Sequence, residues 1–144
     1  MRAFFLIFVC FLVLPPQSHA DTYSAEPDEE LAKVRFIISQ QIAAFQNEDG
    51  ELAFSFASPM IRSQFGSPQN FMMTVKNHYG SIYATQSFKF GKHVAFDGHM
   101  MQEVEFVGAD DGGVDVAIYR LIKFKKLGWR ITGVELIKKP ESEI

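Results

Sequence analysis

The sequence lacks most of the groups on which enzyme and metal chemistry depend. Its single cysteine, Cys10, lies in an apolar leader, so the chain after residue 20 has no thiol. It has no G-x-S-x-G motif, no phosphate-binding loop and no dinucleotide fingerprint. His78, His93 and His99 do not show the i, i+4 spacing of helical metal ligands. We therefore expect no thiol nucleophile, no metal site and no cofactor.

Long apolar runs are also scarce, and the longest lies at the N-terminus. Arg2 precedes the run Ala3–Leu14, and Ser18-His19-Ala20 has the small-x-small pattern that signal peptidases cut. A membrane-spanning helix needs about 17–25 apolar residues, more than this run supplies. We predict that residues 1–20 are a cleaved signal peptide and that the protein is exported, either periplasmic or secreted. A retained membrane anchor is the alternative.

Charge of one sign is not in large excess. The chain has 14 basic and 17 acidic residues and a formal net charge of −3, and removal of Arg2 makes it slightly more acidic. A mildly acidic domain does not favour nucleic acid or an anionic membrane as a partner. Without cysteine, the exported chain must rely on its apolar core rather than on disulfides.

The first half of the chain has helical patterns. After a flexible lead at residues 21–25, Pro27 and the acids that follow it predict a helix start. Serine–proline pairs at residues 58–59 and 67–68 predict two more starts. A further short helix is expected between the helix that begins at Pro27 and the start at residues 58–59. The apolar residues of the first, the short second and the last helix are Leu31, Val34, Ile38, Ile42 and Phe45; Leu52, Phe54 and Phe56; and Phe71, Met72, Val75 and Tyr79, with Gly80 closing the last.

The second half alternates with the period of a β-strand. Four strand-like runs cover roughly residues 86–96, 99–107, 114–124 and 129–137. The Asp97-Gly98 pair between the first two is a strong hairpin signal. Helices followed by strands predict an α+β domain over residues 26–138, with N-terminal helices packed on a four-stranded antiparallel meander sheet and a tail at 139–144.

Several short motifs resemble a bacterial family known as domain of unknown function 4864. They are Ala44-Phe45, Phe56-Ala57-Ser58-Pro59, Ile61, Phe65-Gly66, Phe71-Met72, Tyr79, Tyr83 and Gly128-Trp129-Arg130-Ile131. The resemblance covers about residues 30–137 and implies a reduced relative of the nuclear transport factor 2-like fold, a cone of helices against a curved sheet. Proteins of that fold include small-molecule enzymes, binding proteins and dimerisation modules, so the resemblance implies a fold and leaves the function open.

Pairing the strands brings polar residues into one row. The expected cross-strand pairs are Phe96–His99, Lys92–Glu103, His93–Gln102, Phe106–Val116, Val104–Ile118, Gln102–Arg120, Phe124–Trp129, Ile122–Ile131 and Arg120–Gly133. In this register His93, Gln102 and Arg120 line up at steps of about 4.8 Å. The row crosses an otherwise apolar face, and Glu135 lies one diagonal step from Arg120.

This row supplies the candidate ligand-binding residues His93, Gln102, Arg120 and Glu135. A guanidinium in an apolar face needs a partner, which an anionic or carbonyl-bearing ligand could provide. Two alternatives stay open. The row could be an internal structural network, or a one-residue shift of register could turn it toward solvent.

Two tyrosines are further candidates. Tyr79 and Tyr83 come where the last helix meets the sheet, and their rings could roof the same cavity. Tyrosines at such a junction are also common core residues whose hydroxyl reaches water.

The opposite sheet face is rich in apolar residues, and a homodimer through that face is expected. Its members are Phe88, Phe90, Val94, Phe96, Met101, Tyr119, Leu121, Val134 and Leu136. In the alternative arrangement the helices cover this face, and the polar row then lies outside.

These features lead to three hypotheses about function. The first is an exported domain that binds a small amphipathic or anionic molecule without catalysis. The second is a module for dimerisation or for interaction with another envelope protein. The third is a small lyase, isomerase or hydrolase, although Asp97, Asp110 and Asp111 fall in turns and Asp115 near a strand start, away from the interior that a general base would need.

Overall fold

A computed structural model of the protein describes residues 27–108 and 113–137. The predicted signal peptide (1–20), flexible lead (21–25) and tail (139–144) lie outside the described residues. Within the described ranges, no helix is long and apolar enough to cross a membrane.

Helices occupy the first half of the described chain, as predicted. They are α1 (Pro27–Gln46), α2 (Gly50–Ser55), α3 (Pro59–Phe65), α4 (Pro68–His78) and the short α5 (Gly80–Tyr83). Both serine–proline predictions are confirmed, because the Ser58 and Ser67 side chains accept hydrogen bonds from backbone N–H groups three residues later. The sequence did not predict α5, and α4 ends at His78 rather than running on to Gly80.

The second half is an antiparallel meander. Strands β1 (Ser87–Phe96), β2 (His99–Val107), β3 (Val114–Phe124) and β4 (Gly128–Ile137) lie in sequence order in one sheet. Asp97 and Gly98 both have positive φ, 42° and 72°, as a tight two-residue hairpin turn requires. The predicted α+β architecture is therefore confirmed.

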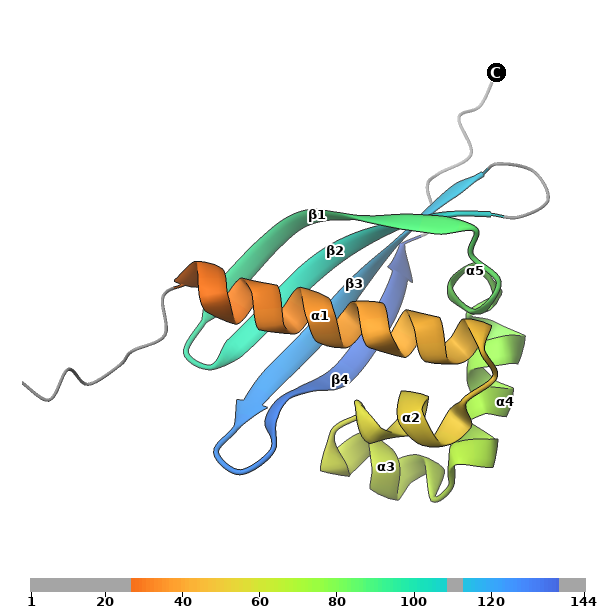
Figure 1. Ribbon diagram of the computed structural model, residues 1–144, viewed down its shortest axis with the longest axis horizontal. Helices are drawn as coiled ribbons and strands as arrows, with labels where there is room; N and C mark the ends of the chain where they lie inside the picture. The colour runs from red at the N-terminus through yellow and green to blue at the C-terminus, as the bar shows by residue number, and fades with distance from the viewer. Residues whose placement is uncertain (1–26, 109–112, 138–144) are drawn as a thin grey trace, which may run out of the picture.

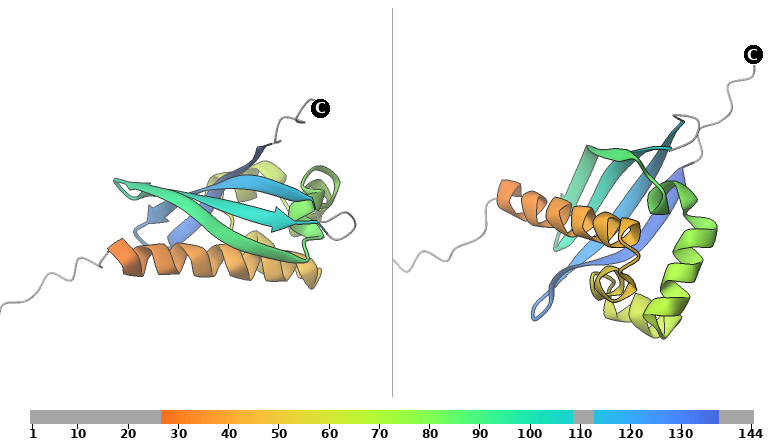
Figure 2. Two further views of the ribbon diagram at one scale, coloured as in Figure 1. Left: turned by 90° about the horizontal axis from the view of Figure 1, so that it is seen from above. Right: turned by 45° about the vertical axis from the view of Figure 1, so that its right-hand side comes forward.

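All the helices of the described residues lie on one side of the sheet (Figure 1). Helix α1 runs across the inner face, and α2 to α4 lie beside its C-terminal half and end (Figure 1). The described helices leave the outer face uncovered (Figure 2). The core forms between α1 and the inner face. Its buried members include Val34, Ile38, Ile42, Phe45, Phe71, Val104, Phe106, Tyr119, Leu121 and Ile131.

The register of the second hairpin corrects the predicted one by a single residue. Val104 pairs with Ala117 rather than with Ile118, and Gln102 pairs with Tyr119 rather than with Arg120. Side chains alternate between the two faces of a strand, so this shift turns every β3 side chain to the other face. Tyr119 therefore faces the helices, and Arg120 faces outward.

Two bulges complete the departure from the predicted register. In β1, Gly91 and Lys92 together lie across from Glu103, between the pairs Phe90–Val104 and His93–Gln102. The predicted pair Lys92–Glu103 is thus replaced by a bulge, whereas His93–Gln102 and Phe96–His99 are confirmed.

In β4 the extra residue is Thr132. It lies between the pairs Leu121–Ile131 and Arg120–Gly133. The predicted pairs Phe124–Trp129 and Ile122–Ile131 are wrong by one residue, whereas Arg120–Gly133 is confirmed because the bulge restores the register. Bulges bend the bulged strand and increase its twist, so both contribute to the curvature of the sheet.

The predicted dimer face is a mixture of the two observed faces. Of its members, Phe88, Phe90, Tyr119, Leu121, Val134 and Leu136 belong to the core or pack against it. Only Val94, Phe96 and Met101 are exposed on the outer face, because the β1 bulge reverses the alternation after Phe90.

Candidate functional site

The described part of the chain encloses a cavity of about 230 Å³ between the helices and the β3–β4 half of the sheet. Its walls come from α1, α3, α4, α5, β3, β4 and the loop before α3. The apolar lining residues are Phe45, Ala57, Ile61, Phe65, Phe71, Val75, Ile82, Ile131 and Val134. Gly133 adds backbone, and Gln41, Gln64, Thr74, Tyr79 and Tyr119 add polar atoms.

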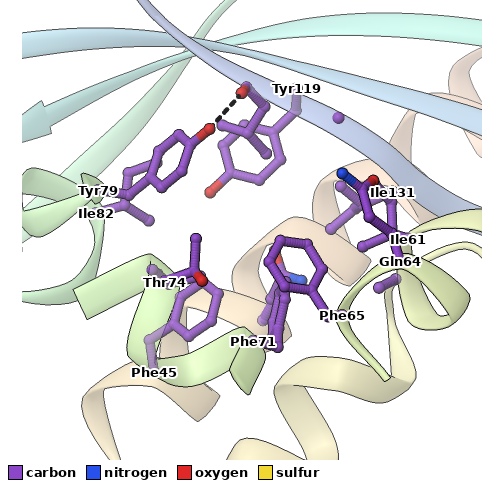
Figure 3. A pocket seen from close by; sticks show the side chains of 15 residues that line it. Phe45, Ile61, Gln64, Phe65, Phe71, Thr74, Tyr79, Ile82, Tyr119 and Ile131 are labelled. Atoms are coloured by element: carbon purple, nitrogen blue, oxygen red, sulfur yellow. Dashed lines mark hydrogen bonds between the residues drawn. The ribbon is translucent and has the colours of Figure 1, made fainter. Parts of the chain in front are cut away.

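An aromatic cluster forms the helix side of this cavity. The centroid of the Phe71 ring on α4 lies 6.0 Å from that of Phe45, 5.4 Å from that of Phe54 and 5.4 Å from that of Phe65. The Phe71–Phe65 pair is edge to face. Figure 3 shows Phe45, Phe65 and Phe71 on the side of the cavity opposite Tyr119. Such tilted and edge-on contacts are the favoured geometries of aromatic pairs, so the rings present a stable apolar surface.

Tyr119 is the unusual polar residue of the cavity. Strand β3 directs its side chain to the inner face, where the residue has 0% exposure. Its hydroxyl has no hydrogen-bond partner among the described residues and points into the space between sheet and helices (Figure 3). Burial raises the pKa of the Tyr119 hydroxyl, so it stays protonated.

Tyr79 provides a direct contrast in the same cavity. Its hydroxyl donates a hydrogen bond of 3.4 Å to the Val134 carbonyl, which ties the α4–α5 junction to β4. Figure 3 shows the two tyrosine rings beside one another. One hydroxyl is therefore used by the protein itself, and the other is not.

The cavity opens toward one edge of the sheet. Most of its deep lining is buried, but Gln64 on α3 is exposed and Ile61, Thr74 and Gly133 are half-buried. These residues come from α3, α4 and the edge strand β4. Beside them, Ser58 N–H donates to the Ile131 carbonyl and Ile131 N–H to the Phe56 carbonyl, which closes the edge of β4 next to this opening.

Gln102, a predicted site residue, lies away from the cavity and has its hydrogen-bonding groups occupied. Its Nε2 lies within 2.8–3.2 Å of the carbonyls of Gly91, Lys92 and Glu103, and its Oε1 accepts from Arg35 Nε. These hydrogen bonds stabilise the β1 bulge by joining it to the Gln102 side chain on β2. His93, which pairs with Gln102, is exposed.

Arg120 and Glu135 meet as predicted, but on the outer face. Arg120 Nη2 lies 2.5 Å from Glu135 Oε2, and the two side chains are 51% and 59% exposed. A Cβ placed on Gly133 would meet only Arg120 Nη1, at 4.0 Å, so the expected room beside the guanidinium exists but faces away from the helices.

Tyr83 separates from Tyr79. Its ring packs against Phe45 at 6.3 Å, and its hydroxyl donates to Glu48 outside the cavity. Burial and this hydrogen bond raise the pKa of Tyr83. Of the predicted site residues, only Tyr79 lines the cavity.

The sequence reasoning missed Tyr119 because it placed this residue on the other face. A usable signal was present. Gly91 and Gly133 interrupt strand patterns, and glycine within a strand often marks a bulge. In β3 the set Ala117, Tyr119 and Leu121 is uncharged, whereas the alternating set contains Arg120. These features favour the observed facing.

Charged groups are missing from the lining that the described residues provide. No Asp, Glu, Lys, Arg or His borders the cavity. The described chain also contains no cluster of three or more His, Cys, Asp or Glu side chains that could hold a metal ion. The arrangement suits an uncharged molecule that makes one or a few hydrogen bonds.

Comparisons with known proteins agree with this fold. Residues 27–144 match the family described as Domain of unknown function (DUF4864). A search of curated proteins finds no match. Among solved structures, the chain is similar to a "Nuclear transport factor 2 (NTF2-like) superfamily protein" from Salmonella enterica subsp. enterica serovar Typhimurium str. LT2. The TM-score is 0.53 at 14% identity, with 83% of this chain and 97% of that chain covered. Because the family match spans most of its length, the chain belongs to the DUF4864 family, and it has an NTF2-like α+β fold.

Proposed function

We propose that the protein is an exported domain that binds a small molecule, without catalysis, in the cavity between its helices and its sheet. The observation that carries this proposal is the Tyr119 hydroxyl, which is buried, faces the cavity and lacks a partner among the described residues. Leaving a buried polar group unpaired costs about 1–3 kcal/mol, and native proteins pair nearly all such groups. A bound molecule would supply the partner.

The size of the cavity supports a small ligand. A dry apolar cavity of about 150 Å³ is enough to bind benzene, and pockets for drug-sized ligands begin near 300 Å³. At about 230 Å³, this cavity suits a molecule of one ring or a short branched chain. The aromatic cluster around Phe71 favours an apolar body for that molecule.

Binding explains the lining better than turnover does. General acid–base catalysis needs a group with a suitable pKa within reach of the substrate. No carboxylate or imidazole lines the cavity among the described residues. Asp115 lies instead at the start of β3, where it accepts a hydrogen bond from Ser81. An enzyme of this fold would need its base elsewhere.

Filling the cavity tests the proposal. Thr74→Trp adds a large ring to a half-buried lining residue of α4, and Met73→Trp adds the same ring to its neighbour, which is 58% exposed and does not line the cavity. Small molecules are extracted from each protein isolated from its host and identified by mass spectrometry. We expect a compound that accompanies the unaltered protein and Met73→Trp but not Thr74→Trp. No enriched compound, or equal enrichment in all three proteins, contradicts binding in this cavity.

The proposed export rests on the composition of residues 1–20. The apolar run and the Ser18-His19-Ala20 ending favour cleavage after Ala20. The intact mass of protein isolated from its host should correspond to a chain beginning at Asp21. A mass that retains residues 1–20 contradicts cleavage.

We also propose, as a second function, self-association through the outer sheet face. Val94 and Met101, which are paired across β1 and β2, are 57% and 43% exposed, and Phe96 is 77% exposed. The ion pairs Lys89–Glu105 and Arg120–Glu135 give the four-stranded sheet both signs of charge. A two-fold interface places one patch against its own copy, so an apolar patch near charges of both signs suits a second copy of this chain.

Sedimentation velocity at micromolar concentration tests this association. We expect a dimer, which Phe96→Glu dissociates without unfolding the protein. Phe36→Glu is the matched control because Phe36 is 63% exposed on α1, away from the sheet face. A monomer at all concentrations, or equal dissociation by both substitutions, contradicts the second function.

A further inference from the structure

We propose that the ligand of the cavity is uncharged and carries a hydrogen-bond acceptor, such as a carbonyl oxygen, that receives a hydrogen bond from Tyr119. This inference rests on the proposed binding function and narrows its ligand to a chemical class. In this proposal Tyr119, the polar anchor, donates a hydrogen bond to the ligand, and the aromatic cluster around Phe71 packs against the apolar part of the ligand.

The placement of the two cavity tyrosines is the first support. The Tyr79 hydroxyl already donates a hydrogen bond to the Val134 carbonyl, so it has no second hydrogen with which to donate to a ligand. Tyr119 has 0% exposure, lines the cavity and donates to no described residue. Of the two tyrosines, Tyr119 is therefore the one whose hydroxyl hydrogen is free for a ligand, and Figure 3 shows its hydroxyl directed into the cavity.

The protonation state of Tyr119 is the second support. Burial raises the pKa of this phenol, and no basic group lines the cavity in the described chain to accept its proton. The phenol is therefore neutral across the physiological pH range and can serve as a donor. A ligand that satisfies it needs an acceptor oxygen or nitrogen.

The charge of the lining is the third support. Burying an ionised group without a partner is strongly unfavourable. The described lining offers neither a cation for an anionic ligand nor a carboxylate for a cationic one. Arg120, which would have suited an anion, lies with Glu135 on the outer face. An uncharged ligand is the class that remains.

Two probes of nearly the same shape test the inference. Acetophenone and α-methylstyrene differ in that a carbonyl oxygen replaces a methylene group on the same aromatic frame. Each is titrated into the purified protein, and its Kd is measured from backbone amide NMR shifts. The ratio of the two Kd values is compared among the unaltered protein, Tyr119→Phe and the matched control Tyr79→Phe. Comparing this ratio between variants cancels the difference in hydration between the probes, because that difference is the same for every variant.

We expect the ketone preference to fall by about five- to tenfold in Tyr119→Phe, as the loss of one neutral hydrogen bond implies. It should be unchanged in Tyr79→Phe, whose hydroxyl is already bonded. Shifts should centre on Ile131, Gly133 and Val134 at the cavity wall.

The remaining outcomes separate the two proposals. If both probes bind in the cavity but Tyr119→Phe leaves the ratio unchanged, the acceptor class is wrong and the binding function stands. If Tyr79→Phe changes the ratio as much as Tyr119→Phe, the anchor is misassigned. If neither probe binds the unaltered protein at millimolar concentration, or the shifts lie away from the cavity, the binding function fails as well.

Discussion

Gln102 and Tyr119 face each other across β2 and β3, and they differ in how their polar atoms are used. Both are fully buried on the inner face of the sheet. The Gln102 amide donates to carbonyls of the β1 bulge and of Glu103 opposite it, and accepts from Arg35. The Tyr119 hydroxyl, one strand away, has no partner among the described residues.

This difference divides the inner face into two halves. At the β1–β2 end, the polar side chain fastens a bulge, and Arg35 packs over Phe90 at 5.2 Å. At the β3–β4 end, the helices stand off the sheet and leave the cavity. Burial of a polar side chain therefore does not identify a binding residue. A buried group with hydrogen-bond partners stabilises the fold, whereas an unpaired one destabilises it, and this is why we propose Tyr119 rather than Gln102 as the ligand contact.

The largest effect on stability is expected at the β1–β2 end, where the buried polar side chain has its hydrogen-bond partners. Gln102→Met preserves the volume but leaves the bulge carbonyls and the Arg35 guanidinium without their amide partner. We expect the free energy of unfolding to fall by about 2–3 kcal/mol. Urea denaturation followed by the fluorescence of Trp129, the only tryptophan, measures the change.

Gln41→Met is the matched control for this prediction. Gln41 is equally buried, but the one hydrogen bond of its amide nitrogen runs to the Ala53 carbonyl, so its loss should be about 1 kcal/mol. Equal losses at the two glutamines would remove the special role of Gln102 at the bulge.

Strand register explains why the sequence predicted the fold better than the site. Strand limits, the Asp97-Gly98 turn and the serine caps depend on local signals, and the structure matches them within about one residue. Which residues share a face depends on register. The connection at residues 108–113 is long enough to permit a shift of one residue, and such a shift exchanged Tyr119 for Arg120.

The alternative interpretation of the polar row was closer to the structure. Arg120 and Glu135 lie outside while the helices cover Tyr119 and Leu121, as the alternative arrangement of the helices required. The cavity itself could not be predicted, because it depends on how far α3 and α4 stand from β4 in space. Of the predicted site residues, Tyr79 alone lines it, and its position at the helix–sheet junction was the signal.

Glu30 is a carboxylate that, like the Gln102 amide, has several hydrogen-bond partners. It accepts from Lys123 at 2.9 Å, Trp129 Nε1 at 2.7 Å and Lys33 at 3.1 Å. The hydrogen bond from Lys123, followed by those from Trp129 and Lys33, lowers the pKa of Glu30 from 4.5 to about 2. The folded pKa is the lower one, so this stabilisation is present above about pH 4.5 and is lost as the pH falls toward 2.

Glu30→Gln should therefore lower the free energy of unfolding by about 1–2 kcal/mol at pH 7, because solvent screening reduces the full effect of the pKa shift. The difference from the unaltered protein should shrink between pH 4.5 and 2. Urea denaturation at several pH values measures it. A difference independent of pH would show that the carboxylate charge does not contribute.

Arg120 tests the outer face, where polar groups are hydrated rather than buried. Arg120→Met removes an exposed ion pair, and such pairs contribute about 0–1 kcal/mol. We expect a loss below about 0.5 kcal/mol and no change in probe binding within the cavity. A loss of several kcal/mol would indicate that the pair is buried in the functional protein, for instance by a second copy on the sheet face. Comparing Arg120→Met with Glu135→Gln at increasing dilution separates that case from a direct structural role.

An effect opposite in sign to the others is expected at Tyr119. Tyr119→Phe removes a desolvated hydroxyl that has no described partner, so the ligand-free protein should keep its stability or gain up to about 1 kcal/mol. Tyr79→Phe breaks the bond to Val134 and should lose about 0.5–1 kcal/mol. Thermal and urea unfolding of both variants measure the contrast. A loss at Tyr119 as large as that at Tyr79 would mean that ordered water already satisfies the hydroxyl. The two ends of the inner face would then be equivalent, and the cavity would no longer need a ligand to complete its hydrogen bonds.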